Sequence, residues 1–242
     1  MPTPAERHRK LAPLANPSVS VVVPVYNEAR VLPALVPQLR ELARSCEVVA
    51  VDGGSTDGTP EALGREFRVV VSPKGRARQM NEGARATSGD VLFFLHADSV
   101  LPPDPVGQLL RVMRAHDAGC FGIRFDRRHA VLGLCSWMSN ARVWARGIAY
   151  GDQGIFMRRE LFEEVGGFPD LPLMEDLQLS LELRRRGVRF GMTRGRITTS
   201  SRRFGTGTVQ MLRTWCAMVP LRRMYLDGAD IDQIAARYRD IR

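Results

Sequence analysis

The segment Val19-Ser-Val-Val-Val-Pro-Val-Tyr-Asn-Glu28 decides the fold class of this chain. Its β-branched run predicts a short buried strand, and the proline and polar residues after it predict a loop. The same pattern then repeats, with apolar runs of strand length separated by stretches with helical spacing. The further strands are predicted at 48–51, 68–71 and 91–95, and the helices at 29–44, 59–66 and 76–86. This alternation predicts an α/β domain whose mostly parallel sheet is flanked by helices on both faces.

The rest of the chain is less regular. Helices are predicted over 105–116, 130–146, 173–186 and 208–226, and strands over 120–125 and 155–157. Residues 1–17, with several prolines and charges, are expected to form a loose N-terminal arm. We expect one catalytic domain over 18–205. Residues 206–242 are expected to form a helical extension that packs on this domain or on a membrane face.

Composition narrows the class of protein. The chain has 242 residues, of which 44% are hydrophobic, so it can bury a substantial core. Its net charge is +9, and all but Lys10 and Lys74 of its 35 basic residues are arginines. Arginine suits phosphate groups, acidic substrates and membrane surfaces, although a compositional bias of the genome explains the excess equally well. Aromatic residues are only 7% and no nucleic-acid-binding module is present, so no nucleic acid partner is expected.

Cysteine usage and hydropathy indicate the compartment. The four cysteines are scattered without a CxxC pair, which excludes a disulfide framework and a zinc site of that type. No apolar stretch reaches the ~18 residues that cross a bilayer, and residues 1–16 lack the apolar core of a signal peptide. We therefore expect a cytoplasmic protein, free or bound at the inner face of the cell membrane.

Polar loops follow three of the predicted strands. They are Pro24-Val-Tyr-Asn-Glu28, Asp52-Gly-Gly-Ser-Thr-Asp57 and His96-Ala-Asp98. Ligands of open α/β sheets bind beyond the carboxyl ends of the strands. The three loops are therefore expected to line one cleft.

Two carboxylates in these loops suggest nucleotide chemistry. Asp98, directly after an apolar strand, is suited to hold a hard divalent cation against a diphosphate, or else it caps a helix. Asp52 can accept hydrogen bonds from a base or ribose, or simply close a turn. His96 is open to three roles, as a core histidine, a ribose contact or a metal ligand.

Two further sites begin predicted helices. The pair Glu175-Asp176 follows a loop rich in glycine and proline, so it either supplies a general base for an acceptor hydroxyl or stabilises the helix dipole. In Gly75-Arg-Ala-Arg78, two guanidinium groups lie near a helix N-terminus, where they either bind a diphosphate or remain solvated.

Together these segments resemble glycosyltransferase family 2. The matching stretches occur in the family's order and spacing over roughly residues 18–200. They are Val21-Val-Val-Pro-Val-Tyr-Asn-Glu28, Val51-Asp-Gly-Gly-Ser-Thr-Asp-Gly-Thr59, Asn81-Glu-Gly-Ala84 with Ser88-Gly-Asp90, His96-Ala-Asp98 and Glu175-Asp176. The chain looks like a compact branch of that family, with a Gly151-Asp-Gln-Gly154 turn and no added membrane helices.

The resemblance implies a GT-A (Rossmann-like) fold and an inverting transfer from a UDP- or GDP-sugar to a hydroxyl acceptor, with a lipid-linked acceptor as one option. It implies Mg²⁺ or Mn²⁺ at Asp98, Asp176 as the base, and Glu175 as a group that binds or positions the acceptor. The expected nucleotide-pocket residues are Pro24, Tyr26, Asn27, Glu28 and Asp52. Arg76, Arg78, His96, Asp152 and Gln153 complete the expected donor contacts, and Asp152 is also the second candidate for the base.

Two positions depart from the family pattern. The usual DxD is His96-Ala-Asp98, without the first carboxylate, so the motif does not fix the metal affinity or a strict metal requirement. Where the family has two adjacent aspartates after the second strand, this chain has Asp52-Gly53.

Two alternatives share the α/β core. A nucleotide-binding regulator without catalysis is disfavoured because Asp176 is present. A nucleotidyltransferase is disfavoured because the loop after the first strand is not a glycine-rich, lysine-containing phosphate loop.

Overall fold

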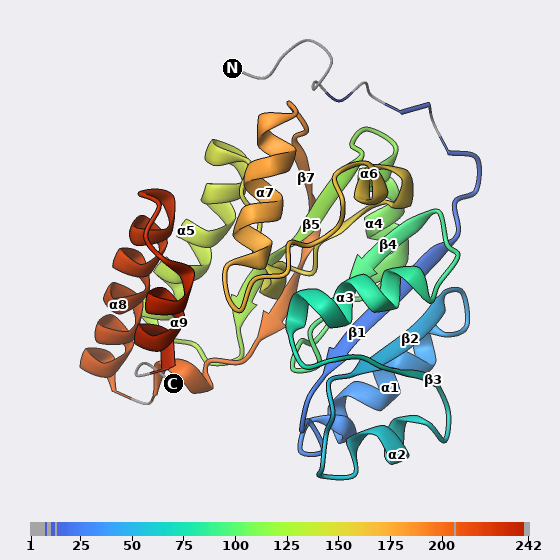
Figure 1. The fold of residues 1–242 in the computed structure, drawn as a ribbon, viewed down its shortest axis with the longest axis horizontal. Coiled ribbons are helices and arrows are strands. Elements are labelled where there is room, and N and C mark those ends of the chain that lie inside the picture. The colour runs from blue at the N-terminus through green and yellow to red at the C-terminus, as the bar shows by residue number, and fades with distance from the viewer. Residues whose placement is uncertain (1–7, 9–10, 13, 206, 240–242) are drawn as a thin grey trace.

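The computed structural model describes residue 8 and residues 11–12, 14–205 and 207–239 (Figure 1). Most of the predicted N-terminal arm (1–7, 9–10 and 13) lies outside the described residues, as do 206 and 240–242 of the predicted extension. Of the described part of the arm, His8 Nε2 lies 3.0 Å from Asp117 Oδ2, and its backbone N–H donates to the Arg186 carbonyl at 2.9 Å. The division at 17 and 205 stays a prediction.

A twisted sheet forms the centre of the described chain. Its strands lie in the order β3-β2-β1-β4-β6-β5-β7. Their bounds are β1 Val19–Val25, β2 Glu47–Asp52, β3 Arg68–Val71, β4 Val91–Phe94, β5 Ala118–Phe125, β6 Phe156–Arg158 and β7 Phe190–Thr199. Strands β1 to β4 are parallel, β6 runs antiparallel between β4 and β5, and β7 is parallel to β5. The predicted mostly parallel sheet is confirmed.

Helices cover both faces of this sheet. Their bounds are α1 Leu32–Leu42, α2 Thr59–Leu63, α3 Arg76–Arg85, α4 Pro105–Met113, α5 Ala130–Arg146, α6 Arg159–Glu164, α7 Glu175–Arg185, α8 Thr208–Leu226 and α9 Ile231–Arg239, with short 3₁₀ turns η2 Gly151–Gln153 and η3 Arg202–Phe204. Side chains alternate across a strand, so Val21 and Val22 of β1 enter different cores. Val21 packs with α1, α2 and α4, whereas Val22 packs with α3, α6 and α7.

The C-terminal helices pack on the segment that leads into α7. Leu221 of α8 and Ile234 of α9 form a third apolar cluster with Ile148, Met174 and Leu177. Figure 1 shows α5, α8 and α9 together on the side of the molecule away from β3. None of the helices in the described ranges is long and apolar enough to cross a membrane.

Candidate active site

The loops after β1 and β2 are joined by hydrogen bonds. Asn27 adopts a left-handed conformation (φ 54°), which asparagine tolerates better than most residues. Its side-chain oxygen accepts from the Thr56 N–H at 2.8 Å, and its own N–H donates to Ser55 Oγ at 2.9 Å. Because β1, β2 and β4 are adjacent and parallel, Asn27, Asp52 and Asp98 lie at the same edge of the sheet.

Asp52 closes the turn after β2. Its buried carboxylate accepts from the backbone N–H groups of Gly54 at 2.9 Å and Ser55 at 3.0 Å. These bonds give Asp52 the turn-closing role that the sequence left open. A donor contact by Asp52 stays a prediction.

Gln79 of α3 is a site-supporting residue that the sequence analysis did not identify. Its buried amide Nε2 donates to the Val25 carbonyl at 2.7 Å and to the Val51 carbonyl at 2.8 Å. One side chain thus fixes the ends of β1 and β2, from which the two loops emerge. Only the helical position of a glutamine facing two predicted strands could have signalled it.

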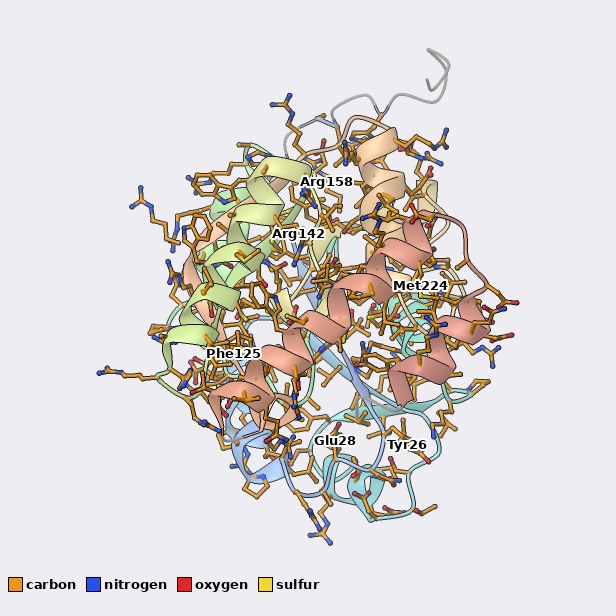
Figure 2. The ribbon with its side chains drawn as sticks, turned by 90° about the vertical axis from the view of Figure 1, so that its left-hand side faces the viewer. Tyr26, Glu28, Phe125, Arg142, Arg158 and Met224 are labelled. Carbon is orange, nitrogen blue, oxygen red and sulfur yellow. The ribbon has the colours of Figure 1, made fainter. Side chains whose placement is uncertain are left out.

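Pro24 lies in the sheet, whereas Tyr26 lies in the loop after β1. Pro24 lies within β1, opposite Val51 of β2. Tyr26 is 38% exposed, and Lys74 Nζ lies 3.9 Å from the centroid of its ring. Figure 2 shows Tyr26 and Glu28 near each other at the lower end of the molecule. Tyr26 is therefore partly exposed beside the two loops, with Lys74 over its ring.

Glu28 and Asp98 are electrostatic neighbours. The pKa of Glu28 is raised above its usual value by burial and then by the charge of Asp98, while Arg202 and Arg76 act in the opposite direction. Two carboxylates close together favour a cation between or beside them. Glu28, from the first loop, and Asp98, from the third, therefore lie close enough for their charges to interact.

Arg76 connects this space to the acidic pair at the start of α7. Its Nη1 lies 3.3 Å from Glu175 Oε1. Although burial alone disfavours its charge, the pKa of the Arg76 guanidinium is raised by the nearby charges of Glu175 and Asp176. Burial and the charge of Asp176 together raise the pKa of Glu175 against the attraction of Arg76.

Asp176 and His96 meet at Gly151. Asp176 Oδ2 accepts from the Gly151 N–H at 2.8 Å, and Oδ1 accepts from the Leu177 N–H at 2.7 Å. A Cβ atom at Gly151 would lie 2.6 Å from His96 Nε2 and 3.5 Å from Asp176 Oδ2. The histidine of the third loop and the candidate base therefore both lie beside Gly151.

At Tyr150, the residue before Gly151, two guanidinium groups lie over the tyrosine ring. Arg142 Cζ is 3.7 Å and Arg222 Cζ is 4.5 Å from the Tyr150 centroid. Burial, aided by the charge of Arg222, lowers the pKa of Arg142, while Asp152 and Asp176 oppose that shift. Gln153 is fully buried and accepts from Arg142 Nη2 at 2.9 Å, so it holds this arginine in place.

Arg78 is separated from the acidic pair by its own ion pair. Its Nε lies 2.8 Å from Asp170 Oδ1 and 2.9 Å from Oδ2, in the loop before α7. The structure thus brings Arg76, but not Arg78, to Glu175 and Asp176. Diphosphate contact by Arg78 stays a prediction.

The carboxylates near Asp98 fit a metal that is shared with a ligand. Among the described residues, no group of three or more His, Cys, Asp or Glu could hold an ion by itself. Mg²⁺ is usually bound by one or two carboxylates together with substrate phosphates. Asp98 and Glu28, whose charges interact, supply the one or two carboxylates that such a shared site needs, and metal binding by Asp98 stays a prediction.

A family model and curated relatives match the chain. The model "Glycosyl transferase family 2" matches residues 20–168. An undecaprenyl-phosphate 4-deoxy-4-formamido-L-arabinose transferase of Yersinia pestis (strain Pestoides F) is 28% identical over 155 residues, covering 58% of this chain and 47% of the relative. The chain therefore spans about half the length of the curated relatives it matches.

Solved structures show the same fold. The mannosyltransferase PcManGT from Pyrobaculum calidifontis, in complex with GDP-Man and Mn²⁺, has a TM-score of 0.61 at 22% identity, covering 94% of this chain and 70% of its own. S. aureus TarS 1-349 in complex with UDP-GlcNAc has a TM-score of 0.59 at 17% identity, covering 93% and 72%. At these identities the likeness concerns the fold.

Proposed function

Since the chain belongs to glycosyl transferase family 2, and is a glycosyltransferase with a GT-A fold, we propose that it transfers a sugar with inversion from a nucleotide-diphosphate donor to an acceptor hydroxyl. The observation that carries this proposal is that contacts join residues of separate segments: Arg76 Nη1 lies 3.3 Å from Glu175 Oε1, and Asp176 Oδ2 accepts from the Gly151 N–H at 2.8 Å. The charges of Asp98 and Arg76 shift the pKa of Glu28 in opposite directions, and Arg76 also interacts with Glu175 and Asp176. His96 and Asp176 both lie beside Gly151. Membership of this family argues against the two alternatives, a nucleotide-binding regulator and a nucleotidyltransferase.

The nucleotide half of the donor is assigned to the loops after β1 and β2. Tyr26 is partly exposed with Lys74 over its ring, and Asn27 and Asp52 shape the loops beside it. The fold neighbours with bound GDP-Man or UDP-GlcNAc support a UDP- or GDP-sugar as donor.

The diphosphate is assigned to the space between Asp98 and Arg76. Mg²⁺ or Mn²⁺ would be held by Asp98, where it would screen phosphate charge and stabilise the departing nucleoside diphosphate. Arg76 contributes a fixed positive charge, and Glu175 positions it through the 3.3 Å contact. Because His96 replaces the first carboxylate of the usual motif, Arg76 carries more of the charge stabilisation here.

Asp176 is assigned as the general base. Its two oxygens accept backbone N–H bonds that fix the carboxylate plane, and each oxygen keeps a further lone pair for an acceptor hydroxyl. As the hydroxyl oxygen attacks the anomeric carbon, its proton passes to Asp176 and the bond to the diphosphate breaks on the opposite face. This geometry inverts the anomeric centre.

The acceptor is proposed to be a hydroxyl at or near a membrane, with a lipid-linked one preferred. Relatives are named as undecaprenyl-phosphate sugar transferases, which motivates the lipid. On α8, Val209 is 64% and Val219 is 52% exposed, among arginines, as expected for a helix at a membrane face. The proposed site of action is the cytoplasmic side of the membrane.

A thermal-shift panel of UDP and GDP, with and without Mn²⁺, tests donor binding. Ligand at about a hundred times its dissociation constant adds ~2.7 kcal/mol, which raises Tm by roughly 5–10 °C for a domain of this size. Asp98→Ala should abolish the Mn²⁺-dependent part of this shift in a protein that remains folded. An unchanged Mn²⁺ response would remove Asp98 from the metal assignment.

Asp176→Asn tests the chemistry. The asparagine keeps the shape and can accept only one of the two backbone N–H bonds, so the structural loss is about 1 kcal/mol. Donor binding should survive, while turnover, read as nucleoside diphosphate released from UDP- and GDP-sugars, should fall ~10²–10⁴-fold. Glu175→Gln, which retains a partner for Arg76, should be milder. Near-normal turnover of Asp176→Asn would transfer the role to Asp152.

A further inference from the structure

Helix α5 is apolar on its outward side as well as on its buried side. Leu132 and Val143 are buried beneath it, whereas Trp137 is 67% and Trp144 is 78% exposed. Leu134 and Met138, at neighbouring positions of the outward face, are also exposed at 47% and 42%. A helix that is apolar all round is usually buried. Its exposed face therefore indicates that something covers it.

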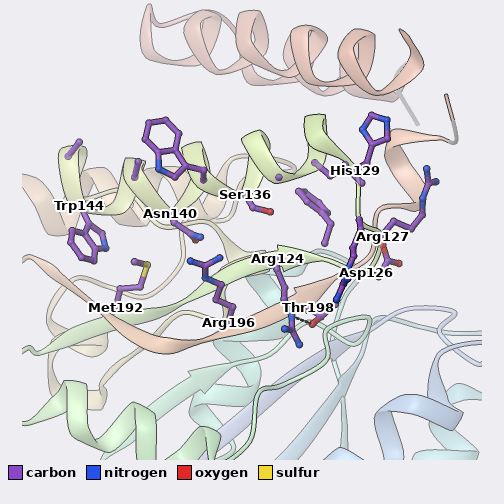
Figure 3. Close-up of a pocket in the computed structure, with 17 residues that line it drawn as sticks. Arg124, Asp126, Arg127, His129, Ser136, Asn140, Trp144, Met192, Arg196 and Thr198 are labelled. Atoms are coloured by element: carbon purple, nitrogen blue, oxygen red, sulfur yellow. Dashed lines mark hydrogen bonds between the residues drawn. The ribbon is translucent and has the colours of Figure 1, made fainter. Parts of the chain in front are cut away.

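A groove with positive charge runs beside this face. It lies between α5 and the edge strand β7 and has a volume of about 960 Å³ (Figure 3). Trp137 and Trp144 line its α5 side, and Arg124 and Arg196 lie on the strand side. Arg124 Nε donates to Thr198 Oγ1 at 2.8 Å, and within the described ranges neither arginine forms an ion pair with a carboxylate. The groove thus joins aromatic surface to a group of arginines, with Asp126 as the single carboxylate among its lining residues.

Helix α8 extends the apolar face. Arg142 of α5 and Arg222 of α8 lie over the same Tyr150 ring, so the two helices are neighbours, and Figure 2 shows both on the side facing the viewer. Leu212 of α8 is 40% exposed, and the nearby Arg213 is exposed without an ion pair to any described carboxylate. Apolar side chains interleaved with arginines thus continue from α5 onto α8.

We propose that α5, α8 and the groove form a docking surface for a bilayer that contains anionic lipid. Trp137 and Trp144 enter the membrane interface, where tryptophan is enriched, and Arg124 and Arg196 bind a lipid phosphate group in the groove. This docking proposal rests on the membrane location in the proposed function, and it identifies the surface that binds the membrane.

The charge of this surface favours a bilayer over a second copy of the chain as its occupant. A two-fold dimer places the same patch against itself, so the arginines around the groove would face each other. A chain with net charge +9 gains by facing an anionic surface instead.

Co-sedimentation with phosphatidylglycerol–phosphatidylcholine vesicles and with pure phosphatidylcholine vesicles tests the surface. We expect binding to the anionic vesicles that weakens as salt increases. Each arginine near the surface contributes about 1 kcal/mol, or roughly fivefold, so Arg124→Gln/Arg196→Gln should bind roughly 30-fold more weakly. The control Arg65→Gln/Arg114→Gln removes the same charge from exposed arginines elsewhere and should bind nearly as the wild type does. Equal losses in both double variants would refute a specific site.

Tryptophan fluorescence gives an independent readout. Trp137 and Trp144 should be quenched by brominated lipid, and Trp137→Phe/Trp144→Phe, which leaves only Trp215, should lose most of that quenching. Absence of quenching in the wild type would overturn the proposal. A dimer that these substitutions disrupt, without vesicle binding, would assign the face to a second copy. Neither donor nor acceptor is present in these assays, so their outcome is separate from sugar transfer.

Discussion

Gly151→Ala adds one methyl group at the point where His96 and Asp176 meet. The new Cβ would lie 2.6 Å from His96 Nε2, whereas its 3.5 Å distance to Asp176 Oδ2 is an ordinary contact. The backbone N–H that Asp176 accepts at 2.8 Å is retained by alanine. The substitution therefore displaces the imidazole and leaves the candidate base in place.

The expected magnitude follows from these distances. To move from 2.6 Å to the 3.4 Å at which ordinary contact begins, the ring must retreat by about 0.8 Å. A misplacement of ~1 Å near the chemistry can cost ~10²-fold in rate. Overpacking costs ~1–3 kcal/mol, and a flexible side chain keeps the cost near the lower end, so Tm should fall by only ~2–4 °C.

Nucleoside diphosphate release from the preferred UDP- or GDP-sugar measures the effect. Gly207→Ala is the matched control, because its Cβ would meet nothing within 4 Å and its φ of −93° suits alanine. The double variant His96→Ala/Gly151→Ala should be no slower than His96→Ala, since the methyl group then has no ring to displace. Turnover of Gly151→Ala equal to that of the control would show that the position of His96 does not matter, and would refute the reasoning.

Two further predictions concern the strand-end loops. Gln79→Met removes both side-chain hydrogen bonds that join the ends of β1 and β2, so stability should fall by ~2 kcal/mol and Tm by ~4–8 °C, with weaker nucleotide binding. An unchanged Tm and an unchanged nucleotide affinity of Gln79→Met would contradict this role of Gln79. Burial and Asp98 raise the pKa of Glu28 above 4.5, so the folded state holds that proton more tightly than the unfolded chain, and stability falls as pH rises through the raised pKa. Glu28→Gln should therefore raise Tm at about pH 7 and much less at about pH 4, as scanning calorimetry can check; a uniform shift would argue against it.

Local sequence signals were sufficient for most of the sheet. The runs at 68–71 and 130–146 coincide with β3 and α5, because hydrophobic periodicity and turn residues act over a few positions. The prediction that polar loops meet at one sheet edge followed from the parallel order alone.

Features that depend on distant contacts were missed. Strand β7 (Phe190–Thr199) contains Arg194, Gly195 and Arg196, which hide its alternation, and it forms by pairing with β5. The antiparallel direction of β6 leaves no local mark. Likewise, Arg76 and Arg78 look equivalent in sequence, and only tertiary structure pairs one with Glu175 and the other with Asp170.

The packing of α8 and α9 against the segment before α7 bears on how the protein is made. A ribosome completes β1, β2 and β4, at whose ends Asn27, Asp52 and Asp98 lie, well before it reaches Leu221 and Ile234 of the third apolar cluster. The loops of the proposed nucleotide side are thus synthesised before the residues that pack with Met174 and Leu177, on either side of Glu175 and Asp176. The candidate base is therefore the part of the proposed site whose surroundings are synthesised last.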